Sequence, residues 1–212
     1  LTLDGVYIDF SDTGDSSTAG LSPLEVAKDS AGNIEVILKG TNVLKAGYFC
    51  AGLQKNGEEV SVGKLTISGE GELQIAGGYA GAGIGGGKWE GERNITISGG
   101  TVAATGGEYG AGIGGGDYGN AANITITAGT VIATGGLLSG VGIGSGKRGN
   151  ATNITIAGGT VKVIGGYNGA EIGSADNVTI TGGTIKTSRI TNISAGARDE
   201  TETFLAGASN GK

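Results

Sequence analysis

The stretch GAGIGGG at residues 81–87 recurs at residues 110–116 and returns as GVGIGSG at residues 140–146. The isoleucine at its centre recurs along the chain at Ile84, Ile113, Ile143 and Ile172. The steps between these isoleucines are 29, 30 and 29 residues. A period of this length is typical of a solenoid, in which every repeat forms one coil and packs on its neighbours.

Two further apolar ladders run through the same repeats. The first is Leu44, Leu73, Val102, Val131, Val161 and Ile185, with steps of 29, 29, 29, 30 and 24 residues. The second is Ile95, Ile124, Ile154 and Val178, which follow Asn94, Asn123, Asn153 and Asn177 and each precede a threonine. Each coil is therefore expected to hold three short apolar segments.

These segments have the pattern of β-strands. Apolar and polar residues alternate in NITIS at residues 94–98 and in TVAAT at residues 101–105, and β-branched residues dominate. Gly-Gly pairs such as Gly106-Gly107 separate them and permit sharp corners. Stacked coils pair each strand with its copies in neighbouring coils, and parallel crossovers are right-handed. The sequence predicts an all-β fold, a right-handed parallel β-helix with three short strands per coil of about 29–30 residues.

The repeats suggest a division of the chain. We expect a β-helix over residues 1–188, with an irregular N-terminal coil at 1–32 and regular coils at 33–188. SPLEVA at residues 22–27 is expected where AGIG strands stand in later coils. Residues 189–212 are expected to form a partial coil and a C-terminal cap or exit segment. Because the chain has no methionine and no signal-peptide pattern, we expect neighbouring domains of a longer precursor.

Composition argues against several functions. The net charge is −6 and the 14 basic residues are scattered, so no nucleic acid partner is expected. The sequence has no apolar run of about 18 residues, so membrane insertion is not expected. Cys50 lies in an apolar stretch, which is typical of a buried structural thiol. The glycine motifs lack the following helix of a phosphate loop, so no cofactor is predicted.

Metal binding has weak support in the sequence. Asp117 is the one acidic residue near a glycine-rich calcium-roll pattern, and such a roll needs a carboxylate in every turn. We therefore predict no metal site in the repeats. Whether Asp9, Asp12 and Asp15 bind calcium stays open, with a solvated acidic loop as the alternative.

Four consecutive stretches resemble a known group of proteins: GTNVLKAG at 40–47, LTISGEGELQIAGG at 65–78, GAGIGGG at 81–87 and NITISGGTVAATGG at 94–107. Their succession is similar to the glycine-rich β-helix repeat region of secreted or cell-wall-attached bacterial surface proteins, as in Gram-positive gut anaerobes. The resemblance covers about residues 33–187. It implies an extracellular module of adhesin-like or carbohydrate-binding type, and it implies no particular binding residues.

The candidate ligand-binding residues lie in three loops that follow the glycine motifs, KWEGER at 88–93, DYGNAA at 117–122 and KRGNAT at 147–152. Five residues after the ladder isoleucines stand Trp89, Tyr118 and Arg148, and four residues after them stand Lys88, Asp117 and Lys147. Equal offsets are expected to stack in a solenoid. Exposed flat aromatics beside polar loops suit a sugar ring, so carbohydrate or host glycoprotein is the expected partner. The alternative is that these side chains only hold the loops together.

The predicted function is a non-catalytic adhesion or stalk module of a bacterial surface protein. Two other functions are alternatives to it. A polysaccharide-processing β-helix enzyme needs carboxylates gathered on one face. The chain has no histidine, and its repeat acids fall at different places in their coils, so no enzyme activity is predicted. The acids in question are Glu90, Glu92, Glu108, Asp117, Glu171 and Asp176.

The second alternative is ice binding through a row of threonines. If Ile95 and Ile97 point inward, Asn94, Thr96 and Ser98 point outward. The row is Thr66, Thr96, Thr125, Thr155 and Thr179. The neighbouring position varies through Ser98, Thr127, Ala157 and Thr181, which argues against a regular lattice. Asn-x-Ser/Thr sequons at Asn94, Asn123, Asn150, Asn153, Asn177 and Asn192 are interpreted as strand chemistry rather than glycosylation sites.

Overall fold

The computed structural model describes residues 1–28, 30–57, 63–173, 176–187 and 193–195. Within these residues the chain forms 21 β-strands and no helix. The strands lie in three parallel sheets, and each coil contributes one strand to each sheet in turn. No helix among the described residues has the length and apolar character needed to cross a membrane.

The first sheet has eight strands. In spatial order they are β1 (Thr2–Asp4), β4 (Ile34–Lys39), β7 (Leu65–Gly69), β10 (Glu92–Ile97), β13 (Ala121–Ile126), β16 (Ala151–Ile156), β19 (Val178–Ile180) and β21 (Ile193–Ala195). The second sheet has seven. They are β2 (Tyr7–Asp9), β5 (Thr41–Lys45), β8 (Glu72–Ala76), β11 (Thr101–Thr105), β14 (Thr130–Thr134), β17 (Thr160–Ile164) and β20 (Thr184–Lys186).

The third sheet has six strands, most of them only two residues long. They are β3 (Leu24–Val26), β6 (Leu53–Lys55), β9 (Ile84–Gly85), β12 (Ile113–Gly114), β15 (Ile143–Gly144) and β18 (Ile172–Gly173). Leu24 pairs with Leu53, and Leu53 pairs with Ile84. SPLEVA therefore stands where the later glycine motifs stand, as predicted.

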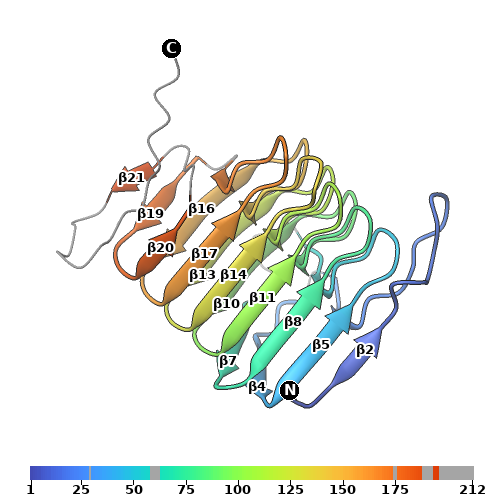
Figure 1. Cartoon of the computed structure of the whole chain (residues 1–212), viewed down its shortest axis with the longest axis horizontal. Helices are drawn as coiled ribbons and strands as arrows, with labels where there is room; N and C mark the ends of the chain where they lie inside the picture. Colours follow the sequence, from blue (N-terminus) through green and yellow to red (C-terminus); the bar gives the residue numbers. More distant parts are fainter. Residues whose placement is uncertain (29, 58–62, 174–175, 188–192, 196–212) are drawn as a thin grey trace.

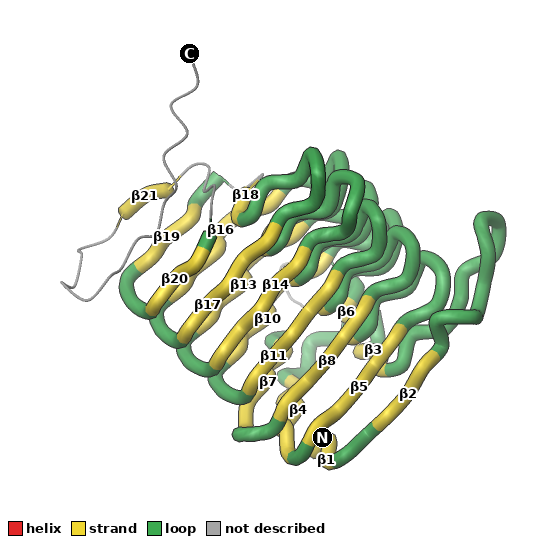
Figure 2. Tube along the Cα trace, viewed as in Figure 1, coloured by secondary structure: helices red, strands yellow, loops and turns green. Residues whose placement is uncertain are grey.

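The molecule is a right-handed parallel β-helix, which confirms the predicted fold class. Figure 1 shows the second sheet as a row from β2 to β20, with the first coil at one end of the stack and β21 at the other. Figure 2 shows that the loops that follow the strands of the second sheet lie beside one another along one edge. These loops lead into the third sheet, and the loops of the predicted site follow the third sheet in each coil.

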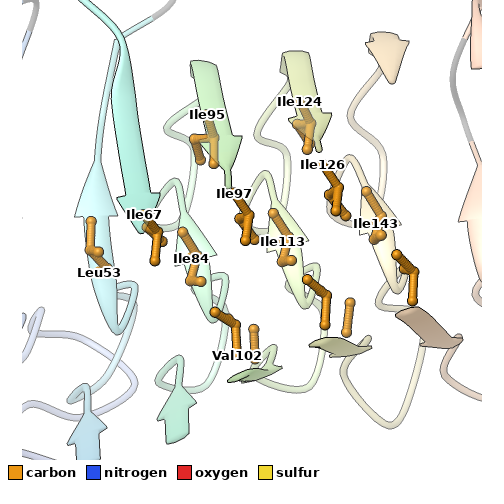
Figure 3. Packing of buried hydrophobic residues seen from close by; sticks show 14 of the residues in the cluster. Leu53, Ile67, Ile84, Ile95, Ile97, Val102, Ile113, Ile124, Ile126 and Ile143 are labelled. Carbon is orange, nitrogen blue, oxygen red and sulfur yellow. The ribbon is translucent and has the colours of Figure 1, made fainter. Parts of the chain in front are cut away.

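Apolar side chains from all three sheets meet inside the coils (Figure 3). Ile84, Ile113 and Ile143 follow one another in the third sheet and are fully buried. Ile95 and Ile97 of β10 face inward from the first sheet, and Val102 does so from the second. Because alternate residues of each strand face inward, the core is one continuous apolar column along the helix axis.

The register confirms most of the predicted ladder, with one correction. Val131 pairs with Val102 and with Val161, as predicted. Leu44, however, pairs with Ile75, while Asn42 pairs with Leu73. Leu38 pairs with Gly69 and Thr41 with Glu72, an offset of 31 residues on both sides of the turn, whereas Leu73 pairs with Val102 at an offset of 29. This coil is thus two residues longer than the next, which displaces Leu44 from the position opposite Leu73. A displacement of two residues keeps the same side chains inward, so alternation alone could not reveal it.

The asparagines that precede the inward isoleucines form a ladder of side-chain hydrogen bonds between coils. The Nδ2 atom of Asn123 donates to the Oδ1 atom of Asn94 at 2.8 Å, and Asn153 donates to Asn123 at 3.0 Å. Asn177 continues the ladder to Asn153 at 3.2 Å. Asn94 and Asn123 have φ angles of 65° and 57°, so each interrupts its strand with one left-handed residue at the same position of the coil.

This ladder gives four of the six sequons a structural role. The side-chain amides of Asn94, Asn123, Asn153 and Asn177 are used between coils, which agrees with the interpretation as strand chemistry. Asn150 is exposed, and Asn192 lies outside the described residues.

Candidate functional site

The three predicted loops stack through their backbones. The amide of Trp89 donates to the carbonyl oxygen of Asp117 at 2.8 Å, and the amide of Tyr118 donates to that of Lys147 at 2.8 Å. Trp89, Tyr118 and Arg148 share a left-handed backbone, with φ angles of 62°, 62° and 66°. The structure therefore brings together the residues that equal offsets grouped in the sequence.

The side chains of these loops form a surface of aromatic and cationic groups. Trp89 is 64% exposed and Tyr118 is 46% exposed. The guanidinium of Arg148 lies 4.6 Å from the centre of the Tyr118 ring and also donates to the Tyr118 hydroxyl. The Nζ atom of Lys88 lies 4.1 Å from the centre of the Trp89 ring and 4.0 Å from that of Phe49. Cation–π contacts of this kind hold aromatic faces at the surface.

A second row of aromatic residues, which the sequence reasoning missed, lies at the corner before the third sheet. The rings of Tyr48 and Tyr79 are stacked, with centres 4.9 Å apart and planes at 11°. Tyr79 and Tyr109 meet edge to face at 5.6 Å. The signal was present, since Tyr48 and Tyr79 stand five residues before Leu53 and Ile84. The interaction with the Tyr109 hydroxyl raises the pKa of Tyr79 to about 12.

The two rows belong to one surface because the third sheet between them is so narrow. The amide of Lys88 donates to the carbonyl oxygen of Phe49 at 2.8 Å, and that of Lys147 donates to Tyr109 at 2.9 Å. The Nζ atom of Lys147 lies 4.4 Å from the Tyr109 ring centre. We call this surface the aromatic edge. Its members are Tyr48, Phe49, Tyr79, Lys88, Trp89, Tyr109, Tyr118, Lys147 and Arg148.

Asp117 lies beneath the aromatic edge rather than on it. Its side chain is buried, and Oδ1 has no hydrogen-bond partner among the described residues. Burial raises the pKa of Asp117, while the charges of Arg148, Lys147 and Lys88 oppose the rise. Lys88, Asp117 and Lys147 thus occupy equivalent positions of the three loops, but the negatively charged member of this row is buried below the surface.

A second buried carboxyl lies inside the coil at the start of β10. Glu92 is 1% exposed, and neither of its carboxyl oxygens has a hydrogen-bond partner among the described residues. Its strand neighbour is Ala121, a small core residue. Burial raises the pKa of Glu92 to about 8, against the opposing charges of Lys55 and Arg93. Glu92 is therefore mostly protonated at neutral pH.

We expect Glu92 to make the fold less stable as the pH rises. Its folded pKa of about 8 exceeds its usual value of 4.5, so the folded chain binds the proton more tightly. The stabilisation is fully present below pH 4.5 and is lost as the pH rises through 8, with a total of a few kcal/mol. Glu92→Gln should remove this dependence, and the difference in Tm between variant and wild type should grow in favour of the variant from pH 5 to pH 9. Parallel melting curves for the two proteins would contradict the assignment.

The acidic residues near the N-terminus are occupied by local contacts. Asp9 accepts from the Ser11 hydroxyl at 2.6 Å and from Lys45 at 2.9 Å, and these bonds lower the pKa of Asp9. Asp15 accepts from the Ser17 hydroxyl at 2.7 Å. Among the described residues, no group of three metal-ligating side chains gathers, at Asp9, Asp12 and Asp15 or elsewhere. Cys50 is buried as predicted, and burial raises the pKa of its thiol.

The predicted threonine row is in register on the outer face of the first sheet. Thr96 pairs with Thr66 and Thr125, Thr125 with Thr155, and Thr155 with Thr179. The threonines are half-buried. β-Branched residues are ordinary on such a face, and the structure adds no support to ice binding.

Comparison with known families supports the repeat architecture. The Beta helix repeat family model matches residues 65–88, 95–117 and 124–147. Each matched segment contains one glycine motif, and the three segments end at Lys88, Asp117 and Lys147. The chain therefore carries a β-helix repeat region. No curated protein and no solved structure matches it.

Proposed function

We propose that the chain is a non-catalytic β-helical module of a bacterial surface protein, secreted or attached to the cell wall, and that its aromatic edge binds carbohydrate. The partner would be a free glycan or the glycan of a host glycoprotein. The observation that carries the proposal is the exposure of Trp89 and Tyr118 side by side on stacked loops, with Lys88 and Arg148 against their rings.

The chemistry of this edge suits a sugar ring. The apolar face of a sugar packs on a flat aromatic ring, and its hydroxyl groups need polar partners at the rim. Trp89 and Tyr118 supply rings, while Lys88 and Arg148 supply donors beside them. The loops are tied to neighbouring coils by backbone hydrogen bonds, so little ordering is needed on binding.

The contacts within the aromatic edge also stabilise its loops, and this stabilisation is the alternative explanation for them. Exposed cation–π pairs contribute about 0.5–1 kcal/mol each, enough to help hold a loop. If this were their whole purpose, removing an exposed ring would lower stability slightly and change no binding. The experiment must therefore measure binding and stability on the same variants.

The proposal predicts that Trp89→Ala and Tyr118→Ala each abolish glycan binding and leave Tm almost unchanged. Wild type is first screened on an array of neutral and acidic oligosaccharides, and the strongest binder is titrated against each variant by calorimetry. Tyr7→Ala is the matched control, because Tyr7 is an equally exposed aromatic on β2 and lies outside the aromatic edge. Binding that survives both substitutions would place the ligand elsewhere, and an array without any binder would refute the function.

A further inference from the structure

A pocket of about 250 Å³ opens where β10, β13 and β16 begin, directly after the three loops of the aromatic edge. Its polar lining residues are Glu92, Arg93, Asn120, Asn150 and Thr152. Ala122 lies between Arg93 and Thr152 in the strand register, and its small side chain leaves room between them. The pocket is thus a small recess lined by one cationic residue, one buried acidic residue and three residues with neutral hydrogen-bonding groups.

Arg93 is the feature of this pocket that needs an explanation. Its side chain is half-buried, and its Nε atom is buried without a hydrogen-bond partner among the described residues. Neither of the two ion pairs formed by described residues involves Arg93. A partly desolvated guanidinium that forms no ion pair within the described part of the chain retains N–H groups that can bond to an anion.

Among the described residues, no acidic side chain forms an ion pair with Arg93. The Glu92 carboxyl points into the coil, and its raised pKa of about 8 leaves it mostly protonated at neutral pH. Glu90 is paired with Lys28 at 2.8 Å. Asp176 continues the outward row of Arg93, Ala122 and Thr152, as the ladder bond between Asn177 and Asn153 indicates. It lies three coils from Arg93, at a distance of about 14 Å from the usual strand spacing.

The pocket adjoins the aromatic edge along each loop. Asn120 and Asn150 follow Tyr118 and Arg148 by two residues, and Arg93 follows Trp89 by four. Lys88, Lys147 and Arg148 add positive charge to the same loops, although the chain as a whole carries −6. The positive charge is therefore local, and general attraction of polyanions does not account for it.

We propose that this pocket binds the carboxylate of an acidic sugar, so that the glycan recognised by the aromatic edge contains a uronic acid. This proposal rests on the proposed function and names its substrate class. The planar guanidinium of Arg93 matches a carboxylate in two parallel hydrogen bonds, and Lys would not provide this geometry. The Asn150 amide and the Thr152 hydroxyl lie in the same recess and can bond to the hydroxyl groups of that sugar.

The test compares one tetrasaccharide in two forms, with its glucuronate carboxylates intact and with them reduced to alcohols. Calorimetric titration of wild type at pH 7 should show at least tenfold tighter binding of the intact form. Arg93→Gln should bind both forms as weakly as wild type binds the reduced one. Lys162→Gln is the control, because it removes an exposed charge from the outer face of β17 and should keep the preference.

The outcomes separate this proposal from the function on which it rests. If wild type binds both forms equally, or Arg93→Gln keeps the preference, the acidic-sugar site is refuted while carbohydrate binding stands. If wild type binds neither form, the acidic-sugar site is refuted, and the array decides on carbohydrate binding. A sulfated tetrasaccharide is titrated alongside; binding as tight as that of the glucuronate form would refute recognition of a carboxylate in particular. Melting curves of Arg93→Gln show that the variant is folded.

Discussion

Val131→Asp is expected to abolish the cooperative unfolding of the coils. Val131 is fully buried in β14 and pairs with Val102 below and Val161 above. An aspartate there would place an unpaired charge among apolar side chains at a cost of several kcal/mol. The free energy of unfolding of a domain is only about 5–15 kcal/mol. In a solenoid each coil is stabilised only by its neighbours, so a disrupted coil also separates the coils on its two sides. Melting followed by circular dichroism should lose its single sharp transition.

Ile132→Asp is the matched control for this prediction. Ile132 is the next residue of the same strand, and it lies half-buried in the outward row with Ala103 and Lys162. Its substitution should lower Tm by only a few degrees, because the new charge meets water. A Val131→Asp protein that melts like the wild type, or like Ile132→Asp, would show that the inward register is wrong.

Gly114→Ala is expected to be nearly as damaging, although it adds a single methyl group. Gly114 has a φ angle of 136°, a backbone conformation that residues with a side chain rarely adopt. Its new methyl group would overlap the carbonyl oxygen of Gly144 in the next coil. We expect a loss of several kcal/mol and a Tm lower by about 10 °C.

Gly32→Ala provides the comparison for Gly114→Ala. Gly32 has no positive φ, and a methyl group there would meet only the Ser30 hydroxyl at 3.8 Å. This substitution should leave Tm within about 2 °C of wild type or raise it slightly, since alanine restricts the unfolded chain. Equal melting of the two variants would mean that the glycine motif is not required for close packing of the coils.

The periodicity of the sequence was enough to predict the fold. The steps between Ile84, Ile113 and Ile143 correspond to neighbouring strands of the third sheet. Alternation in NITIS and TVAAT predicted which residues face inward, because the pleat of a strand fixes that choice. The length of an individual coil was less visible, and for this reason Leu44 was aligned with Leu73 instead of its partner Ile75, although it still faces inward.

The candidate site was predicted in part. Equal offsets grouped Trp89, Tyr118 and Arg148 correctly, since stacked loops of equal length repeat their geometry. The spacing in the sequence could not predict that Asp117 is buried, because the burial of a loop residue depends on the direction of its side chain. Tyr48 and Tyr79 were missed because they precede the glycine motif and reach the same surface across the narrow third sheet.

Glu92 and Arg93 show the same limit of sequence reasoning. The alternation of β10 sends one side chain inward and the other outward, but the left-handed residue Asn94 shifts the pattern between Arg93 and Ile95. The side-chain oxygen of Asn94 accepts from Asn123 of the next coil, so this residue belongs to the asparagine ladder. That ladder is a contact between repeats, and only the stacked structure reveals it.

Hydrogen–deuterium exchange tests most directly our proposal that the aromatic edge binds a glycan. Exchange is measured with and without the strongest binder from the array, at a saturating concentration. We predict added protection in residues 88–93, 117–122 and 147–152, with the outer face of the first sheet at Thr96 and Thr125 unchanged. Protection centred on that threonine row, with the three loops unaffected, would contradict the account.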